Sequence, residues 1–144
     1  MQAAIFGASG GIGRALTANL AARPDISHVH AISRSGTEES EKVTSHTADI
    51  TREADLAALA TALRGTGDIG LVIVATGLLS DASGLQPEKS YRHQSMDAFE
   101  QVFRANTFGP ALVAKHMLPL MPRKGRAVFA ALSARVGSIS DNRL

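Results

Sequence analysis

Short apolar runs alternate along the chain with segments of helical periodicity. Apolar runs predict β-strands at residues 3–6, 70–75 and 126–132, the first of them buried on both faces, and we expect two further strands at residues 28–33 and 43–48. Apolar side chains that recur every three or four residues predict α-helices over residues 12–22, 52–64, 95–105 and 107–118. We expect Thr51 and Ser95 to act as N-caps and Gly65 to lie at the end of the second helix.

Strands that alternate with helices are typical of α/β proteins. Apolar strands joined by helices predict a parallel sheet covered by helices on both faces, and right-handed crossovers restrict the topology to the doubly wound, Rossmann type. No internal repeat, low-complexity tract or interdomain linker interrupts the alternation. We therefore expect residues 1–144 to form a single domain.

A glycine-rich turn follows the first predicted strand and opens the first predicted helix. Gly7 lets the chain turn sharply out of the strand, while Gly11 and Gly13 keep side chains away from a pyrophosphate and from the strand itself. The N–H groups at the start of the helix would then bind the phosphates.

A plain flexible turn is the alternative to a phosphate-binding turn, and the flanking strand and helix argue against it. No Walker lysine follows Gly13, which argues against a phosphate-transferring loop. The candidate cofactor-binding residues of this turn are Gly7, Ser9, Gly10, Gly11, Ile12 and Gly13.

The end of the second predicted strand indicates which dinucleotide the turn would hold. An NAD enzyme usually places Asp or Glu there to bind the ribose hydroxyls, whereas this chain has Ser33 and Arg34. A guanidinium at that position favours a 2′-phosphate, and Arg14 could assist it. We therefore expect a preference for NADP(H), with NAD(H) possible. The alternative is that Arg34 is an ordinary exposed loop arginine.

Composition narrows the classes of protein further. The 144 residues are 44% hydrophobic and 19% charged, and their net charge of +2 gives no reason to expect a nucleic acid or a membrane as partner. Because the chain has no cysteine, it has no disulfides, thiolate metal ligands or cysteine nucleophiles. It also lacks a signal-peptide pattern and any apolar run of membrane-spanning length, so we expect a cytoplasmic protein.

Five motifs in a fixed order give the chain a family resemblance. They are the Gly7-xxx-Gly11-x-Gly13 spacing, Asp49-Ile50 after the third strand, Ala75-Thr76-Gly77 after the fourth, Asn106 on a helix, and Ser133 after the fifth strand. In this order they resemble the short-chain dehydrogenase/reductase family, and residues 132–141 look most like its subgroup of C-factor and sniffer-type carbonyl reductases. The resemblance implies a small carbonyl or alcohol substrate and a homo-oligomer. It implies cofactor contacts at Asp49, Ile50, Ala75, Thr76 and Gly77, and catalytic roles for Asn106 and Ser133.

The chain departs from the family at three places. Ala75 stands where the family has asparagine, and Ala134 follows Ser133 where members often have a second serine, so the serine match could be off by one. The family's Tyr-x-x-x-Lys pair would fall after Leu144, and the only tyrosine, Tyr91, is followed at the fourth position by a serine.

These departures bear on what the chain can do by itself. We expect it to be the N-terminal part of a larger reductase, inactive alone, with the C-terminal strands missing and its fifth strand an exposed apolar edge. The alternatives are a non-catalytic dinucleotide-binding or signalling module, and an inactive truncated remnant.

Histidines and one helix have two interpretations each. His28 and His30 share a face of one strand and could ligate a metal, but without a third ligand we favour surface or edge histidines. His46, His93 and His116 form no pattern with them. The helix at 107–118 could pack in the core or form a subunit contact.

Overall fold

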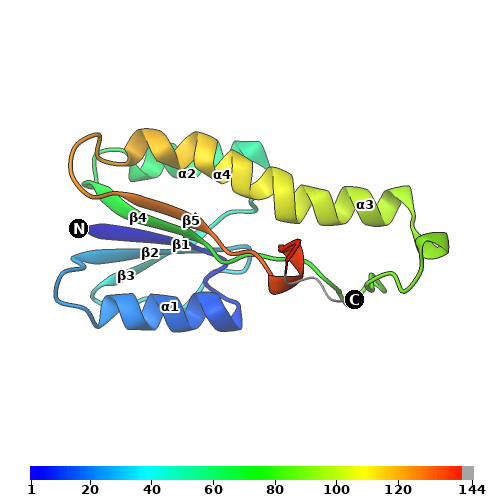
Figure 1. Ribbon diagram of the computed structural model, residues 1–144. Helices are drawn as coiled ribbons and strands as arrows, with labels where there is room; N and C mark the ends of the chain where they lie inside the picture. The colour runs from blue at the N-terminus through cyan, green and yellow to red at the C-terminus, as the bar shows by residue number, and fades with distance from the viewer. Residues whose placement is uncertain (141–144) are drawn as a thin grey trace.

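A computed structural model describes residues 1–140 and contains one five-stranded, fully parallel sheet (Figure 1). The strand order is β3-β2-β1-β4-β5. The predicted α/β, doubly wound fold is confirmed, and every strand ends within about two residues of its expected position. The strands are β1 (Gln2–Phe6), β2 (His28–Ser33), β3 (Val43–Thr47), β4 (Ile69–Val74) and β5 (Val128–Ala131).

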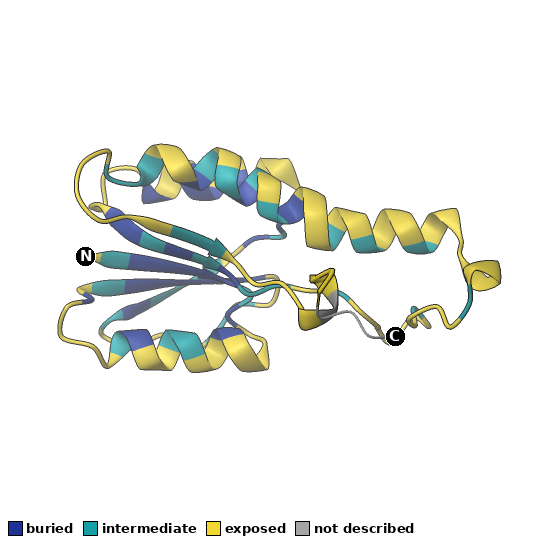
Figure 2. Cartoon of the chain, in the orientation of Figure 1, coloured by how far each residue is buried: buried dark blue, intermediate teal, exposed yellow. Residues whose placement is uncertain are grey.

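Helices cover both faces of the sheet. Helix α1 (Gly11–Ala21) lies on one face, and α2 (Glu53–Leu63) and α4 (Gly109–Met117) lie together on the other (Figure 1). Successive β1 side chains point to opposite faces, so Ile5 joins the core under α1 and Phe6 joins the core under α2 and α4. Because β1 is buried on both faces after its first residue, residues 3–6 are continuously apolar instead of alternating (Figure 2).

The two helices expected at 95–105 and 107–118 form one continuous helical segment. Helix α3 (Met96–Phe103) passes into α4 through a π-helical stretch, Arg104–Phe108, instead of ending before residue 107. None of the residues of α3 is buried, and Figure 2 shows its surface as almost wholly exposed. A 3₁₀ turn, Leu118–Leu120, then closes the segment.

The expected helix ends are partly confirmed. The Ser95 hydroxyl accepts a hydrogen bond from Ala98 N at 3.2 Å, and Gly65 follows α2 with a φ of +87°. The prediction for Thr51 is wrong, because the N-cap of α2 is Arg52, whose side chain makes no capping bond. The Thr51 hydroxyl instead donates to Asp49 Oδ1 at 2.8 Å.

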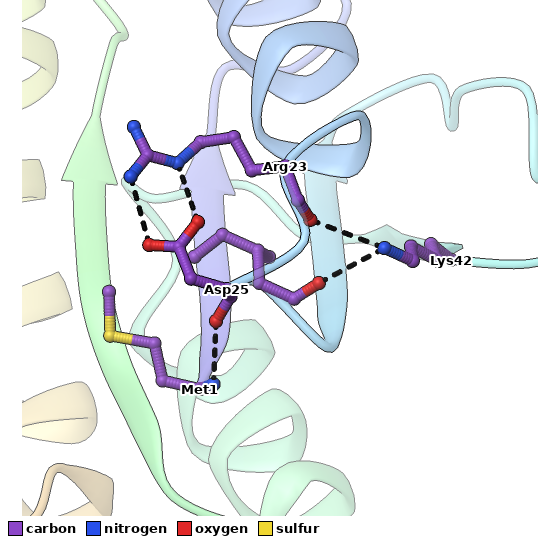
Figure 3. A network of polar contacts seen from close by, with 5 residues as sticks. Met1, Arg23, Asp25 and Lys42 are labelled. Carbon is purple, nitrogen blue, oxygen red and sulfur yellow. Dashed lines mark hydrogen bonds and ion pairs between the residues drawn. The ribbon is translucent and has the colours of Figure 1, made fainter.

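A polar network holds the chain where β1, β2 and β3 begin (Figure 3). Arg23 donates two hydrogen bonds of 2.9 Å to the Asp25 carboxylate, and the N-terminal amine of Met1 donates to the Asp25 carbonyl at 3.0 Å. Lys42 Nζ donates to the carbonyls of Arg23 and Ile26 at 3.2 and 3.3 Å. The network thus ties the turn after α1 to the first residue of the chain and to the residue before β3.

Histidines from two strands meet in a hydrogen-bonded chain, which corrects the expectation of unrelated surface or edge histidines. His30 is only 4% exposed, since β1 and β3 flank its strand. Gln2 Nε2 donates to the Thr66 carbonyl at 2.7 Å, which leaves Gln2 Oε1 to accept from His30 Nε2 at 3.0 Å. His30 Nδ1 must then accept from His46 Nε2 at 3.1 Å. Every polar atom of the His30 ring is therefore satisfied only when the ring is neutral.

The electrostatics of the chain oppose protonation of His30. Burial, followed by the charges of His46 and His28, lowers the pKa of His30 to about 4. Burial also lowers the pKa of His46, although Glu39 opposes that shift. Between the usual histidine pKa of about 6.5 and the folded value, the unfolded chain binds a proton that the folded chain does not.

We predict that acid destabilises the fold through His30. Its contribution to the free energy of unfolding should be complete above about pH 6.5 and fall by roughly 2–3 kcal/mol as the pH drops to about 4. Urea unfolding of wild type and His30→Gln at pH 7.5, 5.5 and 4 should show a flatter pH dependence for the variant. His93→Gln, at an exposed position, is the control and should follow wild type. Parallel pH curves for wild type and His30→Gln would contradict the assignment.

Candidate functional site

A cleft of about 260 Å³ opens at the carboxyl ends of β1, β2 and β4. The chain runs from β1 outward to β2 and β3 and then crosses to β4 on the other side of β1, so the cleft lies where the strand order reverses. In open parallel sheets this is where ligands bind. The lining residues are Gly7, Ser9, Gly10, Ile32, Ser33, Arg34, Ala48, Asp49, Ile50, Thr51, Ala75, Thr76, Gly77, Leu78 and Ala105.

The glycine-rich turn lies between β1 and α1, where close approach of the backbone leaves no room for side chains at two positions. A Cβ on Gly13 would lie 2.1 Å from the Gly7 carbonyl oxygen, and one on Gly7 would lie 2.9 Å from the Ala75 carbonyl oxygen. Gly7 also has a φ of +86°, which disfavours other residues. A Cβ on Gly11 would meet nothing within 4 Å, so the turn is open to an incoming group at that point.

Helix α1 begins beside this opening, since its N-cap Gly10 lines the cleft. Gly10, the N-cap, brings no capping side chain, and the first N–H groups of a helix have no partner within it. Gly7 N and Ala8 N both donate to the Ile32 carbonyl, at 2.8 and 3.0 Å, which fixes the turn against the end of β2. Free N–H groups, a positive helix end and the missing side chain at Gly11 suit a phosphate group.

The far end of the cleft carries opposite charges from two neighbouring strands. Arg34 follows β2 and is exposed, and Asp49 follows β3. Although partial burial raises the pKa of Asp49, hydrogen bonds from the Thr51 N–H and hydroxyl and the charges of Arg34 and Arg52 outweigh it and lower that pKa. Asp49 is therefore a carboxylate at neutral pH, and Arg34 is the cation that lines this end of the cleft.

Side chains next to Arg34 are engaged in shaping the loop. The Ser33 hydroxyl donates to the Gly36 carbonyl at 3.0 Å, which turns the chain directly after Arg34. Arg14 does not line the cleft, and its guanidinium donates to the Ser9 carbonyl at 3.2 Å. Arg14 thus braces the glycine-rich turn from outside.

Asn106 holds the backbone of Leu78, a residue of the cleft lining in the segment that follows β4. Its Oδ1 accepts from Leu78 N and its Nδ2 donates to the Leu78 carbonyl, both at 2.7 Å. Both halves of the amide are therefore used on the backbone of one residue. Asn106 lies in the π-helical stretch, whose wider turn belongs to a class often found at functional sites.

The structure gathers nine of the fourteen predicted site residues into the cleft lining. These are Gly7, Ser9, Gly10, Arg34, Asp49, Ile50, Ala75, Thr76 and Gly77. Gly11, Ile12, Gly13, Asn106 and Ser133 lie outside the lining. Ile12 is 63% exposed on α1, and Ser133 is exposed just after β5, where Leu132 N donates to the Val74 carbonyl at 3.0 Å.

Sequence reasoning missed six residues that line the cleft, namely Ile32, Ser33, Ala48, Thr51, Leu78 and Ala105. All of them except Ile32 are next in sequence to a predicted site residue, and Ile32 is two residues before Arg34. Extending each predicted motif by one residue would have found the other five. Asp141, the last residue of the family-like stretch, lies outside the described residues.

Gly109 brings the helix into contact with a wall of the cleft. A Cβ at this position would lie 2.6 Å from Ile50 Cδ1 and 2.9 Å from Ile50 Cγ1. Ile50 is 7% exposed, packs in the core under α2 and α4, and lines the cleft. The absence of a side chain at residue 109 thus leaves room for the Ile50 side chain in the position where it lines the cleft.

Two further kinds of feature concern residues 1–140, a cluster of metal ligands and a membrane-spanning helix. Within that range, no three His, Cys, Asp or Glu side chains are arranged to hold a metal ion. None of the helices described there is long and apolar enough to cross a bilayer.

The chain is similar to proteins of one family. A family model described as short chain dehydrogenase matches residues 2–140. Among solved structures, one described as a short-chain alcohol dehydrogenase from Burkholderia multivorans is 25% identical with a TM-score of 0.82, and the match covers 99% of this chain and 66% of that one. A short-chain dehydrogenase/reductase from the same organism with bound NADP is 24% identical with a TM-score of 0.81, over 99% and 62% of the two chains.

A third structure, described as the carbonyl reductase Sniffer of Caenorhabditis elegans, is 21% identical with a TM-score of 0.81, over 99% of this chain and 68% of that one. The chain thus spans slightly less than two thirds of the two Burkholderia proteins. A search of curated protein sequences found no match.

We predict that Gly109→Ala is destabilising while Ile50 keeps its Cγ1 and Cδ1 atoms. Overpacking should cost about 1–3 kcal/mol, which exceeds the gain of up to ~1 kcal/mol from a better helix former. Ile50→Ala removes both side-chain atoms that the new Cβ would meet within 3 Å, so Gly109→Ala should cost less in that background than in wild type. Urea unfolding of the two single variants and the double variant measures this coupling. Additive effects of the two substitutions would rule out the contact.

Proposed function

The chain belongs to the short chain dehydrogenase family, and from this premise we propose that it binds NADP(H) and serves hydride transfer to or from a carbonyl or alcohol substrate. The observation that carries the proposal is a single cleft with an open glycine turn at one end and Arg34 at the other. A dinucleotide with an additional 2′-phosphate offers matching groups for both ends.

The charges and the open space of the cleft support this ligand. The free N–H groups of α1 and the open position at Gly11 fit a diphosphate. Arg34 offers a bidentate donor set for a phosphate oxygen pair. One structural neighbour, at 24% identity, is described with NADP bound.

Each group of residues has a task in this proposal. The nicotinamide cofactor supplies the hydride donor or acceptor. Gly7, Ser9, Gly10, Gly11, Ile12 and Gly13 provide the phosphate turn, Arg34 binds the 2′-phosphate, and Asp49 to Ile50 and Ala75 to Gly77 enclose the adenosine part. Ser133 would orient the substrate oxygen, and Asn106 holds the loop at Leu78 in place.

Cofactor binding is measured separately from turnover. Titration of the 144-residue chain with NADPH, followed by the fluorescence of the reduced nicotinamide, should show saturable binding. Oxidation of NADPH by a panel of small aldehydes and ketones reports turnover, which we expect to be absent from the 144-residue chain alone because its only tyrosine, Tyr91, is not followed by the lysine of the family's pair. If NADPH and NADH both fail to bind the folded chain, the proposed function is wrong.

We predict that Arg34 determines the preference for NADPH. Removing a charge-assisted pair should weaken NADPH binding by about 10- to 100-fold in Arg34→Ala and leave NADH binding nearly unchanged. Arg92→Ala is the control, because Arg92 stacks over the Tyr91 ring at 5.4 Å and does not line the cleft. Tighter binding of NADH than of NADPH by wild type would end the NADP(H) assignment.

We also propose that the chain self-associates through its exposed apolar surface. Phe99, Phe103 and Phe108 are 39%, 50% and 56% exposed, and their rings form a ladder with centroid spacings of 6.5 and 6.4 Å. On β5, which is an edge strand, Val128 is 39% exposed. An exposed cluster of aromatic rings and an exposed edge strand each favour association.

We predict a dimer or larger species in sedimentation velocity at micromolar concentration. Phe103→Ser should shift the distribution toward the monomer, since it removes the central ring of the ladder. His93→Ser, exposed and close in sequence, is the matched control and should leave the distribution unchanged. A well-behaved wild-type monomer at all concentrations would contradict self-association.

A further inference from the structure

Ser45, on strand β3, holds the segment that follows Arg34 with two hydrogen bonds. The Ser45 hydroxyl oxygen accepts from Thr37 N at 2.8 Å, and the Ser45 backbone N–H donates to Glu39 Oε1 at 2.9 Å. Because β3 is an edge strand of the sheet, its outward N–H groups need partners other than a neighbouring strand. The segment after Arg34 therefore lies against the edge of β3 and is fastened there at one residue.

Arg34 and Ser35 form the exposed tip of a short loop whose two ends are fixed. At one end, Ser33 is the last residue of β2, and its hydroxyl donates to the Gly36 carbonyl at 3.0 Å. At the other end, Gly36 has a φ of +75°, and a Cβ there would lie 3.6 Å from Ser45 Oγ. Since only two residues separate the fixed points, the hydrogen bonds of Ser45 restrict where the backbone of Arg34 can lie.

We infer that Ser45 is a positioning residue for cofactor preference, which holds the Arg34 loop in the conformation that binds the 2′-phosphate of NADP(H). Ser45 does not line the cleft, so it acts through Arg34 and not on the cofactor. This inference rests on the proposed function, because it needs NADP(H) in the cleft. A loose loop would lose backbone entropy each time Arg34 bound a phosphate, whereas a fastened loop has already lost it.

This role differs from general support of the fold in its effect on two cofactors. NADH has no 2′-phosphate, so its binding does not use Arg34. The glycine-rich turn, which both cofactors would share, is held by other bonds, those of Gly7 N and Ala8 N to the Ile32 carbonyl. Loss of the Ser45 bond should therefore weaken NADPH binding alone, whereas a general loss of structure would weaken the binding of both cofactors.

Two variants of Ser45 and one control test the inference. Ser45→Ala removes the acceptor of Thr37 N, and Ser45→Thr keeps a hydroxyl there. Thr61→Ala is the matched control, because it also removes one hydroxyl hydrogen bond, to the Ala57 carbonyl at 3.0 Å, but on α2 and outside the cleft lining. For each protein, the dissociation constants of NADPH and NADH are measured by fluorescence titration and the stability by urea unfolding.

Ser45→Ala should bind NADPH about 3- to 10-fold more weakly, the effect of one neutral hydrogen bond, and NADH within about twofold of wild type. Ser45→Thr and Thr61→Ala should bind both cofactors within about twofold of wild type. In an Arg34→Ala background, Ser45→Ala should cause no further loss of NADPH affinity, because the side chain that it positions is already gone.

Hydrogen exchange tests the same bond without a ligand. The Thr37 N–H should exchange about 3- to 10-fold faster in Ser45→Ala than in wild type, since its acceptor is lost. Its exchange rate in Ser45→Thr and Thr61→Ala should stay within about twofold of wild type. An unchanged rate in Ser45→Ala would show that the bond does not fasten the loop, and the inference would be wrong.

Three binding results would also overturn the inference. They are unchanged NADPH affinity in Ser45→Ala, an equal loss of NADPH and NADH affinity, and an equal loss of NADPH affinity with and without Arg34. Each of these would leave the proposed function intact as long as wild type binds NADPH. Failure of wild type to bind NADPH would instead remove the proposed function, and the inference with it.

Discussion

The close approach of the first turn of α1 to the Gly7 carbonyl governs the geometry of the cleft. Because Gly13 has no side chain, the helix can begin close to the Gly7 carbonyl at the end of β1, and its N-cap, Gly10, lines the cleft. Gly7 makes a second close approach, to Ala75 just after β4. These two contacts between backbones place the glycine-rich turn and the residues after β4 around one cleft.

The wall after β4 depends on a helix from much later in the chain. Asn106 binds both polar atoms of the Leu78 backbone, and Gly109 allows the same helix to pack against Ile50. The helical segment therefore contacts two walls of the cleft. A π-helical stretch lies between the α-helical parts, and it includes Asn106. These contacts hold the backbone at Leu78 and the side chain at Ile50, two residues of the cleft lining.

Stability and ligand binding rely on different ends of the sheet. The Met1, Arg23, Asp25 and Lys42 network lies where the strands begin, and the Gln2, His30 and His46 chain crosses three strands toward the edge. The carboxyl ends of the strands instead carry open glycines, an exposed arginine and a hydroxyl, that of Thr76, without a partner among residues 1–140. Polar groups are thus satisfied internally where the sheet is anchored and left available where a ligand is expected to bind.

The sequence alone determined the strands, the sheet type and the position of the glycine-rich turn. Those features depend on neighbours in the chain: apolar runs identify buried strands, and glycines between a strand and a helix identify the turn. It could not show the hydrogen bond between His30 and His46, the hydrogen bonds between Asn106 and the Leu78 backbone, or the passage of α3 into α4. The first two features join residues that lie 16 and 28 positions apart in the sequence. The third replaces α-helical by π-helical hydrogen bonding, and local composition carries no signal for any of the three. Only the register of β2 on β3, and the packing of the helices on the sheet, decided them.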